Sequence, residues 1–202
     1  MTTSTLLPLS RDQRQRQTRE HLLEAGRRLI VEKGFGGASL RDIAQAAGYS
    51  QGAFYSNFNS KEALLLELLR LHMEEESAQL SALLLQNDDS TPALMASLEQ
   101  WAQGLDHNTD WSVLAVELLL QAHRSPTFAL AYQSLWDAHR ARIAAFIAEL
   151  FERHQRLPPQ GAEALATSFM ALAHGLALHR INRVPVQAGQ MILAFLRGLL
   201  GS

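Results

Sequence analysis

Residues 39–58 read SLRDIAQAAGYSQGAFYSNF, and this stretch decides the fold that we expect around it. Ser39 opens a capping box, which predicts a short helix over Leu40–Ala47. Gly48 ends that helix, and Ser50 can cap a second short helix directly after it. Two short helices joined by a glycine turn, behind a longer supporting helix, are typical of a helix-turn-helix.

The second helix of this pair has two different faces. Phe54 and Phe58 are four residues apart, so they should be buried against the preceding helices. The other face is small and polar, as a helix requires if it enters the major groove of DNA. It carries Gln51, Gly52, Ala53, Tyr55 and Asn57. A small helical subdomain with aromatic packing is the alternative, and it explains the phenylalanines but not the outer set.

Helical patterns run through the rest of the chain as well. We expect long helices over Gln13–Lys33 and Ser60–Gln86, and others over about 92–105, 111–124, 126–154, 160–182 and 186–200. No segment alternates with the period of two that a half-buried strand requires. The predicted fold class is therefore all-α, with about nine helices.

The N-terminal segment allows two interpretations. Residues 1–12 are expected to form a disordered tail. The arginines at its end and just beyond it are Arg11, Arg14, Arg16 and Arg19. They predict either a basic arm that reaches into a DNA groove or the solvated, frayed start of a helix.

Charge is unevenly distributed along the 202 residues. Met1–Lys61 contains nine Lys and Arg against five Asp and Glu, a net charge of +4, whereas Glu62–Ser202 carries a net charge of −6. Only the first third is therefore suited to face a polyanion. The sequence has no cysteine, which excludes disulfides and thiolate sites. We expect a cytoplasmic protein without a membrane partner, because neither a signal peptide nor a membrane-length apolar run is visible.

The span Thr18–Leu68 resembles the DNA-binding domain of the TetR/AcrR family of bacterial regulators. The matching residues are Ala25, Gly34, Phe35, Ser39–Ala44, Ala47–Ser50, Gly52–Tyr55, Phe58 and Lys61–Leu64. The resemblance implies a three-helix helix-turn-helix domain over residues 13–60 and a helical effector-binding and dimerisation domain over residues 61–202.

The same resemblance implies which residues contact DNA. They are Ser39, Arg41, Ser50, Gln51, Gly52, Ala53, Tyr55, Asn57 and Lys61. Tyr55 and Lys61 are expected to bind phosphates, while Gln51 is expected near the base edges. Position 57 is often His in the family and is Asn in this sequence.

Apolar stripes on the last two helices predict a homodimer interface. The stripes consist of Leu165, Phe169, Leu172 and Leu176, and of Ile192, Phe195, Leu196 and Leu199. Paired with their symmetry mates, two such helices would form a four-helix bundle. The alternative is that these faces pack only within one chain.

The middle helices supply candidates for a ligand pocket. The large apolar and polar candidates are Met95, Trp101, Trp111, His123, Phe128, Tyr132, Trp136, His139, Phe146 and His174. Each of them could instead have an ordinary place in the core or on the surface. No His pair has the spacing of a helical metal site, and no catalytic or nucleotide-binding motif is present. We therefore expect no metal, no cofactor and no enzymatic activity.

Together with these patterns, the resemblance to the TetR/AcrR family implies a homodimeric, ligand-responsive regulator, interpreted as a repressor. It would bind a palindromic double-stranded DNA operator and leave it when a small apolar or aromatic molecule binds. Two alternatives stay open, a non-specific architectural DNA-binding protein and a small helical enzyme.

Overall fold

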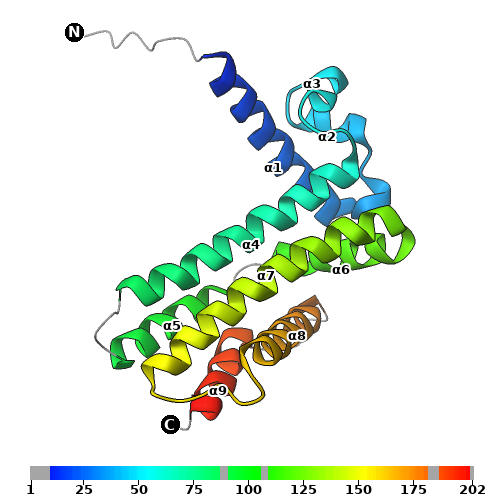
Figure 1. The fold of residues 1–202 in the computed structure, drawn as a ribbon. Coiled ribbons are helices and arrows are strands. Elements are labelled where there is room, and N and C mark those ends of the chain that lie inside the picture. Colours follow the sequence, from blue (N-terminus) through cyan, green and yellow to red (C-terminus); the bar gives the residue numbers. More distant parts are fainter. Residues whose placement is uncertain (1–9, 87–90, 106–108, 182–186, 201–202) are drawn as a thin grey trace, which may run out of the picture. The chain divides into compact units, whose positions relative to one another are not determined.

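The computed structural model describes residues 10–86, 91–105, 109–181 and 187–200, and within these ranges all regular structure is α-helical (Figure 1). The predicted all-α fold class is confirmed. The helices are α1 (Arg11–Gly37), α2 (Leu40–Ala46), α3 (Gln51–Tyr55), α4 (Lys61–Gln86), α5 (Thr91–Leu105), α6 (Thr109–Arg124), α7 (Pro126–Arg153), α8 (Ala162–Ile181) and α9 (Ala188–Leu200). None of the described helices is both long enough and apolar enough to cross a bilayer.

The chain forms two compact units, Met1–Leu68 and Leu69–Ser202. The first unit therefore includes the start of α4 and extends beyond residue 60, where the sequence placed its end. Packing explains the difference, because Leu64 of α4 is fully buried. A β-carbon built on Gly26 of α1 would lie 2.6 Å from Leu64 Cδ2, so a larger residue at position 26 would require the Leu64 side chain to shift.

Helix α1 begins earlier than the sequence indicated. Ser10 Oγ accepts a hydrogen bond from the backbone of Gln13, and Gln13 Oε1 accepts one from the backbone of Ser10. This capping box satisfies the free amides at the helix start. Residues 11 and 12 are consequently helical and do not belong to a disordered tail, whereas residues 1–9 lie outside the described part of the chain.

The regular course of α1 is interrupted at Gly34, where the sequence predicted the helix to end. Gly34 has φ 74° and ψ 163°, a conformation that side chains with a β-carbon rarely adopt. The interruption lets the chain turn toward α2. The core of the first unit consists of Leu22, Ile30, Ala38, Ile43, Phe54 and Leu64, all fully buried.

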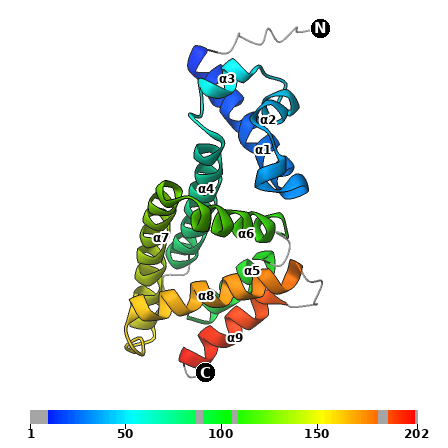
Figure 2. The same ribbon diagram turned by 90° about the vertical axis from the view of Figure 1, so that its right-hand side faces the viewer.

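Helices α5 to α9 and the later turns of α4 build the second unit. Helix α9 lies beside both α5 and α8, and α8 packs against α6 and α7 (Figure 2). The buried residues at its centre include Leu94, Leu98, Ile147, Leu150, Phe151, Ala166, Ile192 and Leu196. Helices α5 and α9 approach very closely, since a β-carbon on Gly189 would lie 1.8 Å from the carbonyl oxygen of Ala102.

Candidate functional site

The short helix α3 separates buried aromatic residues from exposed polar ones. Phe54 and Phe58 are buried, and their ring centroids are 5.7 Å apart. Tyr55, between them in sequence, is 58% exposed. Gln51 and Gly52 are exposed as well, while Ala53 is half-buried. The helix therefore has one buried and one exposed face. The exposed face presents the side-chain amide of Gln51, the backbone of Gly52 and the phenol of Tyr55.

Two of the predicted contact serines also cap the helices. Ser39 Oγ accepts from the backbone of Asp42 at 3.0 Å, and Ser50 Oγ accepts from the backbone of Ala53 at 3.2 Å. Arg41 is exposed on α2, and it lines a shallow hollow together with Ser50 and Gln51. Side chains from both helices of the motif thus reach one surface.

Asn57 and Lys61 do not lie on the outward flank where the sequence placed them. Asn57 is half-buried, and its side-chain amide donates to the carbonyl oxygen of Ala53 at 2.8 Å. Lys61 Nζ donates to the carbonyl oxygens of Phe35 and Ala38 and lies 4.1 Å above the centroid of the Phe35 ring. Both side chains donate hydrogen bonds to backbone carbonyls at helix ends, although the buried Asn57 Oδ1 has no hydrogen-bond partner among the described residues.

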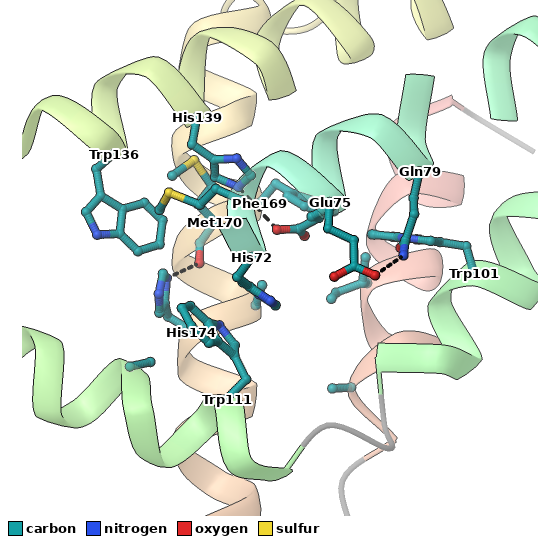
Figure 3. Close-up of a pocket in the computed structure, with 16 residues that line it drawn as sticks. His72, Glu75, Gln79, Trp101, Trp111, Trp136, His139, Phe169, Met170 and His174 are labelled. Carbon is teal, nitrogen blue, oxygen red and sulfur yellow. Dashed lines mark hydrogen bonds and ion pairs between the residues drawn. The ribbon is translucent and has the colours of Figure 1, made fainter. Parts of the chain in front are cut away.

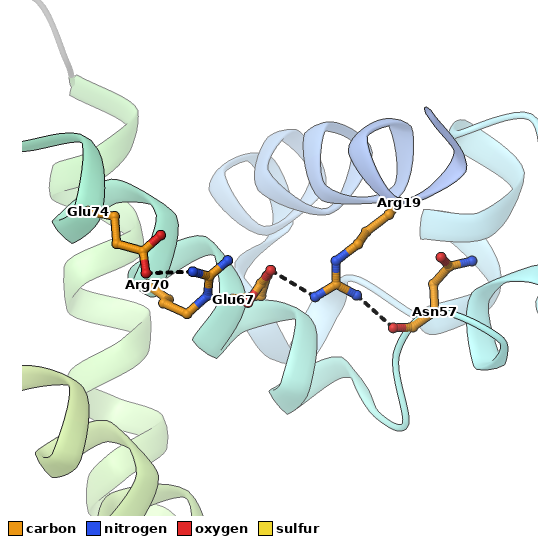
Figure 4. Close-up of polar contacts among 5 residues, drawn as sticks. All are labelled: Arg19, Asn57, Glu67, Arg70 and Glu74. Atoms are coloured by element: carbon orange, nitrogen blue, oxygen red, sulfur yellow. Dashed lines mark hydrogen bonds and ion pairs between the residues drawn. The ribbon is translucent and has the colours of Figure 1, made fainter. Parts of the chain in front are cut away.

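Arg19 is a positioning residue that joins three parts of the first unit (Figure 4). Its guanidinium donates to the backbone carbonyl of Asn57 at 2.8 Å and pairs with Glu67 of α4 at 2.8 Å. It also lies 4.2 Å from the ring centroid of Phe58. Arg19 is therefore no member of a basic arm, whereas Arg11, Arg14 and Arg16 are exposed on α1.

A cavity of about 290 Å³ lies within the second unit (Figure 3). Five of the predicted pocket residues line it, namely Trp101, Trp111, Trp136, His139 and His174. The sequence analysis missed the contribution of α4, which is His72, Met73, Glu75, Glu76 and Gln79. It also missed Ala115, Phe169, Met170, Ala173, Ala188 and Ile192.

The other five predicted pocket residues lie elsewhere. Phe128 and Phe146 are buried in packing, and Met95 packs against the core. His123 is exposed near the end of α6. Tyr132 lines a neighbouring hollow between α6, α7 and α8, which also touches Trp136 and His174. Large side chains at helical spacing fill a core as readily as they line a pocket, so the pattern alone did not separate them.

Histidines and one carboxylate form a polar group in the cavity. His139 is 4% exposed; its Nε2 lies 3.2 Å from Glu76 Oε2 and its Nδ1 lies 3.4 Å from the hydroxyl of Ser77. His72 stacks on Trp111 with ring centroids 3.7 Å apart. Burial lowers the pKa of His72 to about 4, although the charge of Glu76 acts in the opposite direction.

His174 is placed by its own helix. Its Nδ1–H donates to the carbonyl oxygen of Met170 at 2.9 Å, and its ring centroid lies 4.5 Å from that of Trp136. Burial lowers the pKa of His174, and the hydrogen bond to Met170 opposes that shift. In the described part of the chain, no group of three His, Asp or Glu side chains is arranged to hold a metal ion.

The predicted dimer stripes are largely buried within a single chain, which leaves five of their residues little exposed surface for a second copy. Leu165, Phe169, Leu176, Ile192 and Leu196 are each at most 8% exposed, and Phe169 and Ile192 line the cavity. Leu172, Phe195 and Leu199 remain half-buried. The exposed residues of α8 and α9 are instead Glu163, Thr167, Ser168, Ala171, Leu178, His179, Gln190, Met191, Ala194, Arg197 and Gly198.

Comparison with known proteins matches the two units to two different family models. Residues 22–68 match the family model described as bacterial regulatory proteins, tetR family. Residues 90–201 match the model described as BetI-type transcriptional repressor, C-terminal. The second match alone covers more than half of the chain.

Curated relatives are similar over part of their length. The HTH-type transcriptional repressor AcnR of Corynebacterium glutamicum is 30% identical over 131 residues, which are 63% of this chain and 64% of that protein. The repressor NemR of Escherichia coli K12 is 39% identical over 67 residues, 33% of this chain and 34% of that protein. The matched regions thus span less than two thirds of these relatives.

Solved structures share the fold. A TetR-family regulator from Rhodococcus sp. superimposes with a TM-score of 0.75 at 20% identity, over 92% of this chain and 99% of that one. A transcriptional regulator from Saccharomonospora viridis, crystallised in complex with choline, gives a TM-score of 0.65 at 20% identity, over 92% and 96% of the two chains.

Proposed function

The chain belongs to the TetR/AcrR family of bacterial transcriptional regulators, and from this premise we propose that it is a dimeric, ligand-responsive repressor. Its operator is a palindromic stretch of double-stranded DNA. Its effector is a small molecule that occupies the cavity of the second unit. The names of AcnR and NemR support the assignment as a repressor.

The exposed face of α3 carries the proposal for DNA. Gln51 and Gly52 stand at its N-terminal end, where a recognition helix meets the base edges. The Tyr55 hydroxyl is exposed for a phosphate contact, and Arg41 lies beside Gln51. The exposed arginines in the first turns of α1 add positive charge to the same unit. Asn57 and Lys61 act in this proposal by holding the helix ends in place.

Dimerisation follows from the small size of α3. A helix of five residues reads too few base pairs alone, so two copies related by a two-fold axis are needed. We place the contact on the exposed faces of α8 and α9 around Ala171, Leu178 and Met191. Gly198 has open space where a β-carbon would lie, which permits a close approach of a second helix.

Helix α4 is the proposed connection between ligand and DNA. It contributes five residues to the cavity wall and contributes Glu67 to the ion pair with Arg19. A ligand that favours one position of α4 over another would change the support of α3 and the separation of the two recognition helices. The choline in the S. viridis structure supports small-molecule binding by a chain of this fold.

The DNA assignment is tested with a labelled fragment from upstream of the protein's own gene, by fluorescence anisotropy. We expect Gln51→Ala to lower the binding free energy by about 1–3 kcal/mol and to relax specificity at one base pair. Tyr55→Phe removes only the hydroxyl, so we expect a smaller loss of DNA-binding free energy, and one that is similar for all DNA sequences. Ser81→Ala, an exposed change on α4, serves as the control.

Two results would contradict this proposal. Undiminished binding by the Gln51→Ala, Tyr55→Phe double variant would mean that α3 does not face DNA. Equal affinity for every sequence tried, without a protected palindrome in a footprint, would support an architectural DNA-binding protein instead.

A further inference from the structure

The cavity shares one of its walls with a second, more open space. This outer hollow between α6, α7 and α8 has a volume of about 560 Å³. Its lining includes Leu119 and Leu178, which are 57% and 45% exposed, so it opens to solvent. Four residues line both spaces, namely Ala115, Trp136, Met170 and His174. The partition between the cavity and the outer hollow is therefore made of these few side chains.

Trp136 is the largest side chain of the partition, and ring contacts hold it in place (Figure 3). Its ring centroid lies 4.5 Å from that of His174 and 6.0 Å from that of His139. The indole Nε1 is buried, yet it has no hydrogen-bond partner among the described residues. A buried N–H without a partner costs free energy, so such a group in a native structure requires an explanation.

The other members of the partition differ from Trp136 in size or in attachment. His174 Nδ1–H donates to the carbonyl oxygen of Met170 at 2.9 Å, so the imidazole is fixed to its own helix. The unbranched side chain of Met170 adapts to its neighbours, and Ala115 is too small to close a passage. Trp136 is therefore the side chain that is large enough to close the partition and that can turn without losing a hydrogen bond.

An acceptor for the Trp136 N–H stands one helical turn earlier on α7. Tyr132 lines the outer hollow but not the cavity, and its ring meets that of Trp136 edge-on with centroids 5.9 Å apart. Burial raises the pKa of the Tyr132 hydroxyl, and the Trp136 N–H opposes that shift. The N–H thus lies toward the hydroxyl without completing a hydrogen bond. A turn of the indole toward Tyr132 would supply the missing partner.

The edge of the cavity at α4 and α5 is braced by hydrogen bonds instead. Trp101 Nε1 donates to Gln79 Oε1 at 3.1 Å, which connects α5 to α4. Gln79 Nε2 in turn donates to Glu75 Oε1 at 3.4 Å. A molecule that entered at this edge would have to separate Trp101 from Gln79, whereas entry past Trp136 requires no such loss.

Resting on the proposed function only in that the cavity admits a small molecule, we propose that Trp136 is the gate of the cavity. Its indole closes the cavity toward the outer hollow in this structure. Rotation of the indole toward Tyr132 joins the two spaces into one passage that leads to solvent between α6, α7 and α8. The gate sets the rate at which the cavity fills and empties.

Cysteine accessibility measures this route directly, because the chain has no cysteine of its own. Ala173→Cys places a thiol in the cavity and Val116→Cys places one in the outer hollow; neither residue lines the other space. Ala166→Cys, at a fully buried core position on α8, reports a general loosening of the fold. The probe is methyl methanethiosulfonate, which is small and uncharged. Mass spectrometry follows the methylthio adduct on the full-length protein.

Trp136→Ala is combined with each of the three cysteines in turn. We expect it to accelerate the reaction of Ala173→Cys about tenfold or more, and to change the rates at the other two cysteines by less than about twofold. Val116→Phe places a larger side chain in the outer hollow while Trp136 is kept. It should slow the reaction of Ala173→Cys about tenfold.

The gate is overturned if Trp136→Ala leaves the rate of Ala173→Cys unchanged, or if it accelerates Ala166→Cys by the same factor, which would mean loosened packing. It is also overturned if Val116→Phe has no effect. A greater acceleration by Gln79→Ala than by Trp136→Ala would place the entrance at the α4 edge instead. These rates are measured without DNA, so their failure leaves the proposed repressor intact, and a chain that bound no DNA would still show the gate.

Discussion

Acidification should destabilise the second unit through His72. The pKa of His72 is lowered from 6.5 to about 4, mainly because the half-buried ring is desolvated where it stacks on Trp111. As the pH falls, the unfolded chain therefore takes up a proton before the folded one does. The contribution of His72 to stability is complete above pH 6.5 and is lost progressively between pH 6.5 and about pH 4.

The size of the effect follows from these two values. Lowering the pH from about 7.5 to about 5 should reduce the free energy of unfolding by about 2 kcal/mol through this one residue. With a urea dependence of about 2 kcal/mol per M, the midpoint of unfolding would move by about 1 M. Glu76, His139 and His174 also face the ring, so the effect must be measured as a difference between variants.

The comparison is between the wild type and His72→Gln at both pH values and one protein concentration. Tryptophan fluorescence reports the second unit, because the three tryptophans of the chain all lie in it. On acidification, we expect the free energy of unfolding of His72→Gln to fall by about 2 kcal/mol less than that of the wild type. His123→Gln, at an exposed position on α6, should behave as the wild type does. The reasoning would be refuted if the free energy of unfolding fell equally in the wild type, His72→Gln and His123→Gln.

Three further substitutions test the packing and the backbone. Gly189→Ala should lower the stability of the second unit by about 1–3 kcal/mol or more, because its methyl group would overlap the backbone of Ala102; urea unfolding checks this, with Gly175→Ala as the control because a β-carbon there meets no other atom. Gly34→Ala should cost about 1–3 kcal/mol, since φ is +74° there, and near-complete retention of the thermal midpoint would contradict it. Arg19→Lys keeps the charge but loses the paired geometry, so we expect weaker DNA binding in anisotropy and a lower melting temperature; unchanged DNA affinity would exclude a positioning role for Arg19.

The helix starts in the first unit were predictable because capping is local. Ser39 and Ser50 bond to backbone groups three residues away, and such pairs can be read directly from the sequence. The inward turn of Asn57 and Lys61 was not predictable in this way. Lys61 donates hydrogen bonds to the carbonyl oxygens of Phe35 and Ala38, which are distant in sequence. A basic residue close to a recognition helix is typical of a phosphate contact, so the sequence pattern favoured that interpretation over the capping of a helix end.

The cavity and the dimer stripes show a second limit of sequence patterns. The segment His72–Gln79 of α4 is rich in glutamate and is typical of a solvated face, yet four of its polar residues line the cavity. The apolar stripes of α8 and α9 correctly indicated burial, but they did not indicate what buries them. Leu165 and Leu196 are covered by their own chain, and only the fold of that chain distinguishes this from contact with a second copy.

The shortness of α3 has a consequence for genetics. A helix of five residues is not stable by itself, and Phe54 and Phe58 hold it to the rest of the first unit. A random screen for loss of repression would therefore recover substitutions at these buried positions alongside substitutions at Gln51 and Tyr55. The two classes separate only when abundance of the protein is measured beside repression, because the first class is also expected to be degraded in the cell.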